Sequence, residues 1–173
     1  GPIERILVTH THVDHSPGAR ALAAHTGAPV LGRRPLHPAG QDASFAPSDE
    51  LAGGEHFELG PDVHLLAIHT PGHASNHLCY LLLQEKLLFT GDHVMQGSTV
   101  VINPPDGDMA VYIANLRRLL DIPLQWLAPG HGFLIDEPHA VVSKTIAHRL
   151  GREAKVLAGL QKLAAAAPVD EAA

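Results

Sequence analysis

The sequence has a single cysteine, Cys79, among its 173 residues, so a disulfide within the chain is excluded. Basic side chains are also in the minority, since 12 Lys and Arg stand against 18 Asp and Glu. The resulting net charge of −6 argues against an extended nucleic-acid-binding surface. No apolar run approaches the ~20 residues that a membrane span needs, and no signal peptide is visible. These absences predict a cytoplasmic protein that does not act in a membrane.

Several catalytic patterns are missing as well. There is no internal repeat, no glycine-rich phosphate loop, and neither a second cysteine nor a serine elbow that would indicate a covalent nucleophile. At 45% hydrophobic residues the chain can bury a core, and its length is that of one domain. Because no covalent nucleophile is indicated, the candidate nucleophile is a water molecule bound to a metal ion.

Histidine, in contrast, is plentiful at 14 residues, and one stretch concentrates it: His10-Thr11-His12-Val13-Asp14-His15. The stretch follows the apolar run 6–8, which predicts a strand that delivers it to its C-terminal end. Side chains at i and i+2 share a face of an extended segment, so His10 and His12 can bind one cation. Beyond a turn, Asp14 and His15 can reach a second cation. Imidazole beside carboxylate suits zinc.

Three later motifs repeat this arrangement of an apolar strand, a Gly or Pro, and a potential ligand. They are Thr70-Pro71-Gly72-His73, Thr90-Gly91-Asp92-His93 and Pro129-Gly130-His131-Gly132. A carboxylate can bridge two metals through its two oxygens, which is the role expected of Asp92. A histidine-rich surface loop is the competing interpretation of the first motif, but such a loop does not usually follow a strand and recur downstream. The motifs predict ligands collected along one edge of a sheet.

The remaining pattern predicts an α+β fold. Asp108 is expected to cap a helix whose apolar positions follow the helical period, and Ser16 to cap an earlier helix before Pro17. A basic face on the last helix is expected to be solvated. Helices are predicted at 17–25, after 108, and from 137 to about 167; strands are predicted at 28–31, 55–59, 63–68, 78–83, 86–90, 100–102 and 124–128.

These motifs closely resemble the metallo-β-lactamase fold superfamily, from about residue 3 to about residue 160. Its pattern is HxHxDH, a histidine after a strand, a bridging aspartate and a last histidine. Within it, TPGHASNHLCYLL, LLFTGDHVM, NPPDGDM and HRLGRE look most like the β-lactamase-like protein 2 group. That group includes bacterial hydrolases of unassigned substrate and a mitochondrial endoribonuclease that acts on single-stranded RNA.

The resemblance implies a binuclear site. One ion would take His10, His12 and His73, the other Asp14, His15 and His131, and Asp92 would join both. The ions are expected to be zinc, with manganese or iron as alternatives, and a hydroxide bridging them would be the nucleophile. Asp14 and Asp92 are the expected catalytic residues. Asn76 and His77 are expected to contact the substrate.

The resemblance also implies an αββα sandwich. Members of the family normally carry several strands ahead of HxHxDH, so this chain is expected to be N-terminally truncated relative to the family. A second copy or a partner chain is expected to cover the incomplete sheet. Residues 1–135 would form a partial hydrolase domain. Residues 136–173 would form a C-terminal helical segment, the start of a truncated winged-helix-like module.

Three functions follow as hypotheses. The first is a zinc-dependent hydrolase of a phosphodiester, such as single-stranded RNA, or of a small ester, although the acidic balance counts against strong RNA binding. The second is a thioester hydrolase of the glyoxalase II type, which shares HxHxDH. The third belongs to another class: an inactive metal-binding fragment.

Overall fold

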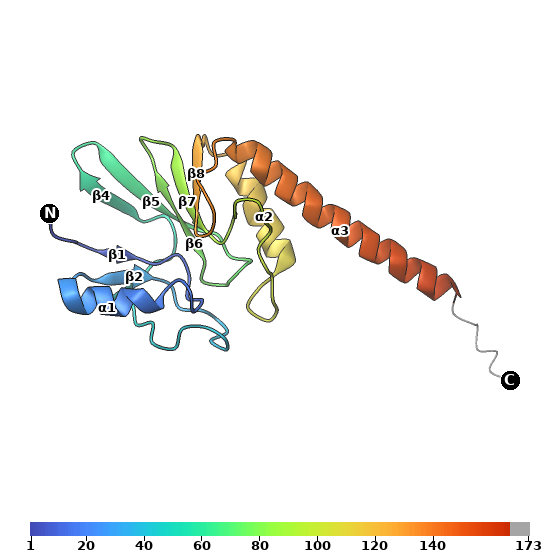
Figure 1. The fold of residues 1–173 in the computed structure, drawn as a ribbon, viewed down its shortest axis with the longest axis horizontal. Helices are drawn as coiled ribbons and strands as arrows, with labels where there is room; N and C mark the ends of the chain where they lie inside the picture. Colours follow the sequence, from blue (N-terminus) through green and yellow to red (C-terminus); the bar gives the residue numbers. More distant parts are fainter. Residues whose placement is uncertain (167–173) are drawn as a thin grey trace.

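The computed structural model describes residues 1–166, in which two β-sheets lie between helices (Figure 1). The end of the predicted 136–173 segment lies outside these described residues. The smaller sheet is parallel and consists of β1 (Ile6–Leu7), β2 (Val30–Gly32) and β3 (Asp49–Glu50). The larger sheet consists of β4 (His56–Gly60), β5 (Val63–His69), β6 (Leu78–Leu82), β7 (Leu87–Gly91) and β8 (Trp126–Pro129). The helices are α1 (Pro17–Thr26), α2 (Met109–Leu119) and α3 (Pro138–Ala166).

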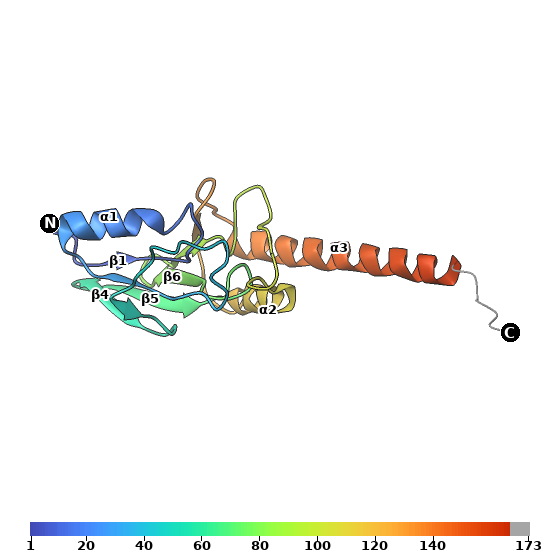
Figure 2. The same ribbon diagram turned by 90° about the horizontal axis from the view of Figure 1, so that it is seen from below.

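The layers follow the order helix, sheet, sheet, helix, so the predicted αββα class is confirmed (Figure 2). Alternation along β5 explains the two cores. Leu65 and Ala67 point into the core between the sheets, whereas Leu66 and Ile68 pack on the opposite face, where α2 and α3 lie. Tyr80 joins the sheets, because its hydroxyl donates to the Val8 carbonyl at 2.8 Å.

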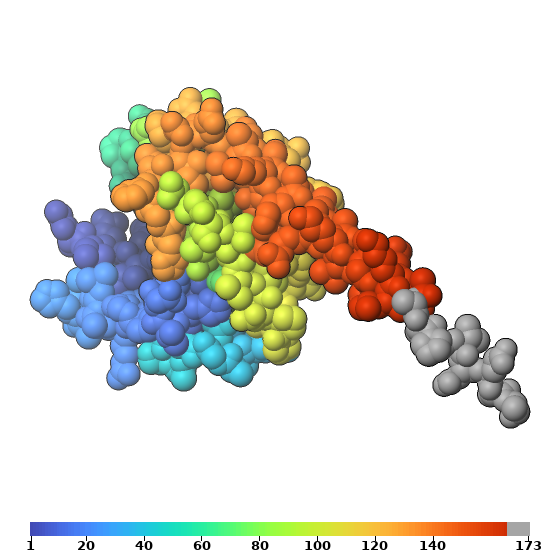
Figure 3. Space-filling model, turned by 45° about the vertical axis from the view of Figure 1, so that its right-hand side comes forward, coloured from blue at the N-terminus to red at the C-terminus, as the bar shows by residue number. Residues whose placement is uncertain are grey.

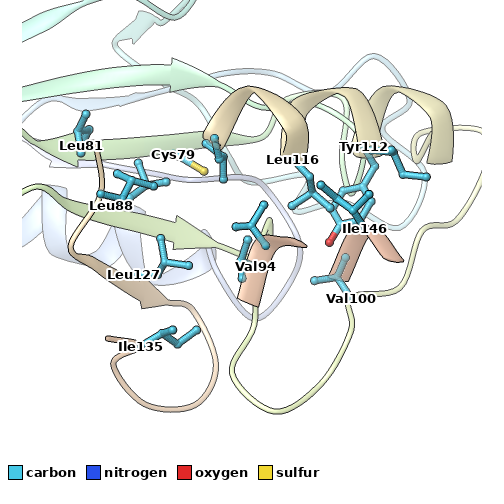
Figure 4. Packing of buried hydrophobic residues seen from close by; sticks show 14 residues of the cluster. Cys79, Leu81, Leu88, Val94, Val100, Tyr112, Leu116, Leu127, Ile135 and Ile146 are labelled. Atoms are coloured by element: carbon cyan, nitrogen blue, oxygen red, sulfur yellow. The ribbon is translucent and has the colours of Figure 1, made fainter. Parts of the chain in front are cut away.

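The larger core lies between the five-stranded sheet and helices α2 and α3 (Figure 4). Cys79 is fully buried there, as its apolar surroundings in the sequence predict. Tyr112 and Leu116 from α2 and Ile146 from α3 cover the sheet. This core supports β7 and β8, whose ends carry predicted ligands.

The helix ends differ from the sequence-based expectations at one of two caps. The Asp108 carboxylate accepts from the Val111 backbone N–H at 2.9 Å, so this predicted cap is confirmed. Ser16 occupies the predicted N-cap position, but its side chain forms no capping hydrogen bond. Its backbone is in the αR region, not the extended one typical of a side-chain cap, and its hydroxyl donates to the Asp42 carboxylate at 2.7 Å.

The predicted strand at 100–102 is also wrong, because the segment is irregular. Its backbone carbonyls accept hydrogen bonds from side chains and not from a neighbouring strand. The Val100 carbonyl accepts from the Arg149 guanidinium, and the Val101 carbonyl accepts from the His73 ring. The short strand β3 was not predicted, since two exposed acidic residues carry no apolar pattern.

Helix α3 packs only its first turns on the body and then projects away from it (Figures 1 and 2). Val142 and Ile146 are buried, whereas Val156, Leu160 and Leu163 are exposed. Within residues 1–166, none of the helices combines the length and apolar character that a membrane crossing requires.

Candidate metal centre

The predicted ligands meet at one edge of the sandwich because several strands end there. His10 and His12 follow β1, and Asp92 directly follows β7. β7 and β8 are parallel and pair through Gly91 and Pro129, so their C-terminal ends place Asp92 beside His131. The site is thus built on strand ends of both sheets.

The first cluster is formed by His10, His12 and His73. The Nδ1 atom of His12 lies 3.0 Å from Nε2 of His10 and 2.9 Å from Nε2 of His73. His10 and His73 are buried, and burial lowers the pKa of all three imidazoles. Neutral imidazoles offer lone pairs, so this cluster fits a cation.

A hydrogen bond fixes which nitrogen of His73 faces the cluster. Its Nδ1–H donates to the Val101 carbonyl at 2.7 Å, which leaves the lone pair on Nε2. Such a bond orients an imidazole for metal binding and raises its basicity. The irregular segment at Val101 therefore supports a candidate ligand.

The second cluster is formed by Asp14, His15 and His131. Nε2 of His131 lies 3.3 Å from Oδ2 of Asp14 and 3.2 Å from Nε2 of His15. The side chains of Asp14 and His131 are 57% and 44% exposed. This side of the centre is therefore open to solvent, whereas the first cluster is covered.

Asp92 lies between the two clusters. Its Oδ2 is 3.4 Å from Nε2 of His15 and 3.6 Å from Nε2 of His73, and its Oδ1 is 3.6 Å from Nε2 of His131. Oδ1 is buried and has no hydrogen-bond partner among the described residues. A buried carboxylate oxygen without a partner, surrounded by imidazoles, fits divalent cations on both sides.

The charges of Asp92 and His15 are coupled in the metal-free protein. Burial raises the pKa of the Asp92 carboxyl, but the hydrogen bond and charge of His15, with His73 and His131, lower it overall. Burial alone would lower the pKa of His15. The hydrogen bond to Asp92 and the negative charge of Asp92 outweigh burial, so the pKa of His15 is raised above its ordinary value. In the metal-free protein each of these two side chains favours the charged form of the other across 3.4 Å.

Gly130 makes room for this arrangement. A Cβ atom at this position would lie 2.9 Å from Oδ1 of Asp92 and 2.9 Å from Cε1 of His15. Any other residue would push these two side chains apart. The glycine of the Pro129-Gly130-His131 motif is therefore needed for close approach of β8 to the centre.

Asn76 and His77 lie beneath the centre and are fully buried. The Asn76 amide donates to the Thr11 hydroxyl at 2.7 Å and to the Arg33 carbonyl at 2.9 Å. The Asp92 backbone N–H donates to Nε2 of His77 at 3.1 Å. Both residues support the loops that carry ligands, and their contact with a substrate stays a prediction.

Asp106 is a site residue that the sequence reasoning missed. Its carboxylate accepts from the Ser75 N–H at 3.1 Å, from the Ser75 hydroxyl at 2.5 Å and from the Gln41 amide at 3.1 Å. It thereby joins the 103–107 loop to the segment after His73. A turn motif, Asn103-Pro104-Pro105-Asp106-Gly107, was the only signal in the sequence.

Replacing His77 by leucine tests its supporting role. Because Nε2 accepts the Asp92 N–H, Nδ1 carries the proton and donates to Thr70 at 2.9 Å. Leucine leaves the Asp92 N–H without an acceptor, so we expect a loss of about 1–3 kcal/mol in the free energy of unfolding. We also expect zinc affinity to fall about 10–100-fold, measured with a chelating indicator dye. A His64→Leu variant on β5 serves as control, and equal zinc affinities in the two variants would contradict the role.

Comparisons with known proteins identify the family of this chain. The family model described as the metallo-beta-lactamase superfamily matches residues 1–131. "Thioesterase pkgB" of Emericella nidulans is 34% identical over 156 residues, covering 90% of this chain and 42% of that protein. "Atrochrysone carboxyl ACP thioesterase" of Aspergillus fumigatus is 31% identical, covering 93% of this chain and 48% of that protein. The chain thus spans less than half the length of these two relatives.

A solved structure shows the same fold. "TTHA1623 in a di-iron-bound form" superposes with a TM-score of 0.66 and 25% sequence identity. The superposition covers 78% of this chain and 73% of that one.

Proposed function

The chain belongs to the metallo-β-lactamase superfamily, and we propose that it is a metal-dependent hydrolase whose substrate is a thioester. The observation that carries the proposal is the position of Asp92, whose carboxylate lies within 3.6 Å of histidines from both clusters. His10, His12 and His73 would hold one ion and Asp14, His15 and His131 the other, with Asp92 shared. We propose zinc, with manganese or iron as alternatives; the di-iron form of a structural relative supports the last. Bound there, divalent ions supply Lewis acidity and activate water at neutral pH.

The two clusters have different expected roles, because the first is largely covered and the second is open to solvent. His10 and His73 of the first cluster are buried, so their imidazoles are shielded from competing water. Asp14 and His131 face solvent, so a substrate reaches the centre from their side. The Asp14 carboxylate is the most exposed acid of the centre, and we assign it to orient the attacking water and to accept its proton.

A thioester is favoured over the other substrates by the two curated relatives, which are named as thioesterases. A phosphodiester, RNA-like or small, and a simple ester are the alternatives that share the same chemistry. An inactive metal-binding fragment is the alternative of another class. A second copy or partner chain at the β1 edge belongs to the proposal as well, because β1 pairs only with β2 within residues 1–166.

A substrate panel tests the proposed function. The zinc-loaded protein is assayed with S-acetyl-N-acetylcysteamine, p-nitrophenyl acetate and bis(p-nitrophenyl) phosphate. We expect thioester hydrolysis that disappears on chelation and returns with zinc. Asp14→Asn should lower kcat at least about a hundredfold, the lower end of what one general base contributes. Asp62→Asn, in the distant β4–β5 turn, serves as control.

Turnover of the phosphodiester without the thioester would replace the proposed substrate. No turnover of any compound by a protein with full metal content would favour the inactive fragment.

A further inference from the structure

A groove with a cavity volume of about 430 Å³ lies between the segment 95–99 and the first turns of α3. Ser98 and Thr99 line one wall, Lys144 and His148 line the other, and Met95 and Val141 are the apolar part. Figure 3 shows the two segments side by side, the first in yellow-green and α3 in orange. The volume is within the range of small-molecule sites, about 300–1,000 Å³.

The polar groups of the groove have one common chemistry. Lys144 and His148 are one helical turn apart, so the ammonium and the imidazole lie on the same face of α3. No carboxylate lines the groove. Among the described residues, the side chains of Lys144, His148, Ser98 and Thr99 form no hydrogen bond or ion pair with the protein. Lys144, His148 and Ser98 are exposed, so their donors are accessible to a ligand. The groove therefore offers hydrogen-bond donors without an acidic partner.

A groove with basic groups and no carboxylate is unusual in this protein because of how its charges are distributed. The chain has an excess of acidic residues, yet α3 carries five of its 12 lysines and arginines. Glu153 is the only carboxylate within α3. Of these five, Lys144 lines the groove, and its positive charge beside the other donors attracts an anion there.

The groove is joined to the candidate metal centre through its loop. At one end the Gln96 N–H donates to the His131 carbonyl at 3.4 Å. At the other end the Val101 carbonyl accepts from His73 at 2.7 Å. The Arg149 guanidinium donates to Val100 and so binds α3 to the same loop. The loop that lines the groove is therefore hydrogen-bonded at its two ends to one residue of each cluster.

We propose that this groove binds a phosphate group of the thiol carrier that presents the acyl group to the metal centre. The assignment of the carrier rests on the thioesterase function proposed above; the anion site rests on the groove itself. A phosphate accepts several hydrogen bonds at once, and a lysine ammonium with nearby hydroxyl donors suits it. Free inorganic phosphate shares this chemistry, so the experiment separates it from a carrier.

The first measurement is binding of inorganic phosphate to the zinc-loaded protein, followed by the NMR signals of the His148 imidazole. We expect saturable shifts, and in Lys144→Ala a dissociation constant about fivefold higher, the scale of an exposed charged contact. Lys162→Ala is the matched control, because it lies on the same face of α3 about 27 Å farther along the axis. Phosphate bound at the metals would not depend on Lys144.

The second measurement compares acetyl-coenzyme A with S-acetyl-N-acetylcysteamine, which has the same thioester but no phosphate. Lys144→Ala is expected to lower kcat/KM for the first relative to the second about fivefold, and Lys162→Ala to leave the ratio unchanged. Binding of phosphate that is equal in both variants would overturn the anion site. If that binding depends on Lys144 but the kinetic ratio does not, the carrier assignment is wrong. If neither thioester is hydrolysed, the proposed function fails while the phosphate titration still decides the anion site.

Discussion

Replacing Asp92 by alanine is expected to remove bound metal from the protein and to lower hydrolysis by more than about a hundredfold. Even residues that only orient metal ligands typically contribute about 10–100-fold, and Asp92 lies within 3.6 Å of imidazoles from both clusters. Without it, each cluster keeps only three candidate ligands and loses its shared negative charge. Metal per chain by elemental analysis and kcat/KM on the same preparation measure the effect.

An Asp92→Asn variant separates the effect of the carboxylate charge on metal binding from the effect of side-chain volume. Asparagine keeps the volume beside Gly130 but removes the negative charge that two cations would share. We expect its metal content to fall as in Asp92→Ala. The matched control is Asp121→Ala, at an exposed acid after α2. Full metal content in Asp92→Asn would show that the carboxylate is not needed, contrary to the assignment.

Acidification of the metal-free protein is expected to lower its stability steeply below pH 6.5. Burial lowers the pKa of His10 and His77, and lowers that of His93 to about 3, from the ordinary value of 6.5. Below pH 6.5 the unfolded chain therefore binds protons that the folded chain does not bind. The free energy of unfolding consequently decreases as the pH is lowered. Each such histidine contributes about 1.4 kcal/mol per pH unit.

The other shifted groups do not reverse this trend. The pKa of His15 is raised, so its contribution is fully present below 6.5 and is lost only as the pH rises through its folded pKa. The pKa of Asp92 is lowered from 3.8, so its contribution is lost only in stronger acid. Urea unfolding with a chelator at a series of pH values measures the slope. Between pH 6 and 4, His93→Leu is expected to reduce it by about 1.4 kcal/mol per pH unit. The exposed control His37→Leu should leave it unchanged, and an equal slope in both variants would contradict the explanation.

The candidate ligands could be predicted from the sequence because local geometry brings most of them together. His10 and His12 stand at i and i+2 just beyond β1, and Asp92 directly follows the apolar strand β7 at a Gly-Asp turn. Which strand ends meet in space is not a local property. The proximity of His131 to Asp92 depends on the parallel pairing of β7 with β8.

Features that depend on competing partners could not be predicted. Ser16 precedes a helix in the expected way, but a distant carboxylate, Asp42, takes its hydroxyl. Val101 lies in a strand-like run, but the His73 ring uses its carbonyl. The role of Asp106 depends on Ser75, which is 31 residues away in the chain. In each case a long-range hydrogen bond overrides the local pattern.

The basic face of α3 was expected to be solvated, and the exposure of His148, Arg152 and Lys155 agrees with that. Arg149 differs, because it is half-buried and its guanidinium donates to the Val100 carbonyl. Lys144 and His148 are exposed and also line a groove with Ser98 and Thr99. Helical spacing identifies a face but not the loop that packs beside it.

The central claim is that two ion sites share Asp92, and metal stoichiometry tests it most directly. The wild-type protein, His12→Ala and His131→Ala are each dialysed against zinc and then zinc-free buffer, and zinc per chain is measured. We predict two ions in the wild type and a loss in each variant, from the covered cluster in the first and the open cluster in the second. A wild-type chain that retains fewer than two zinc ions, or two variants that both retain the wild-type amount, would contradict the account.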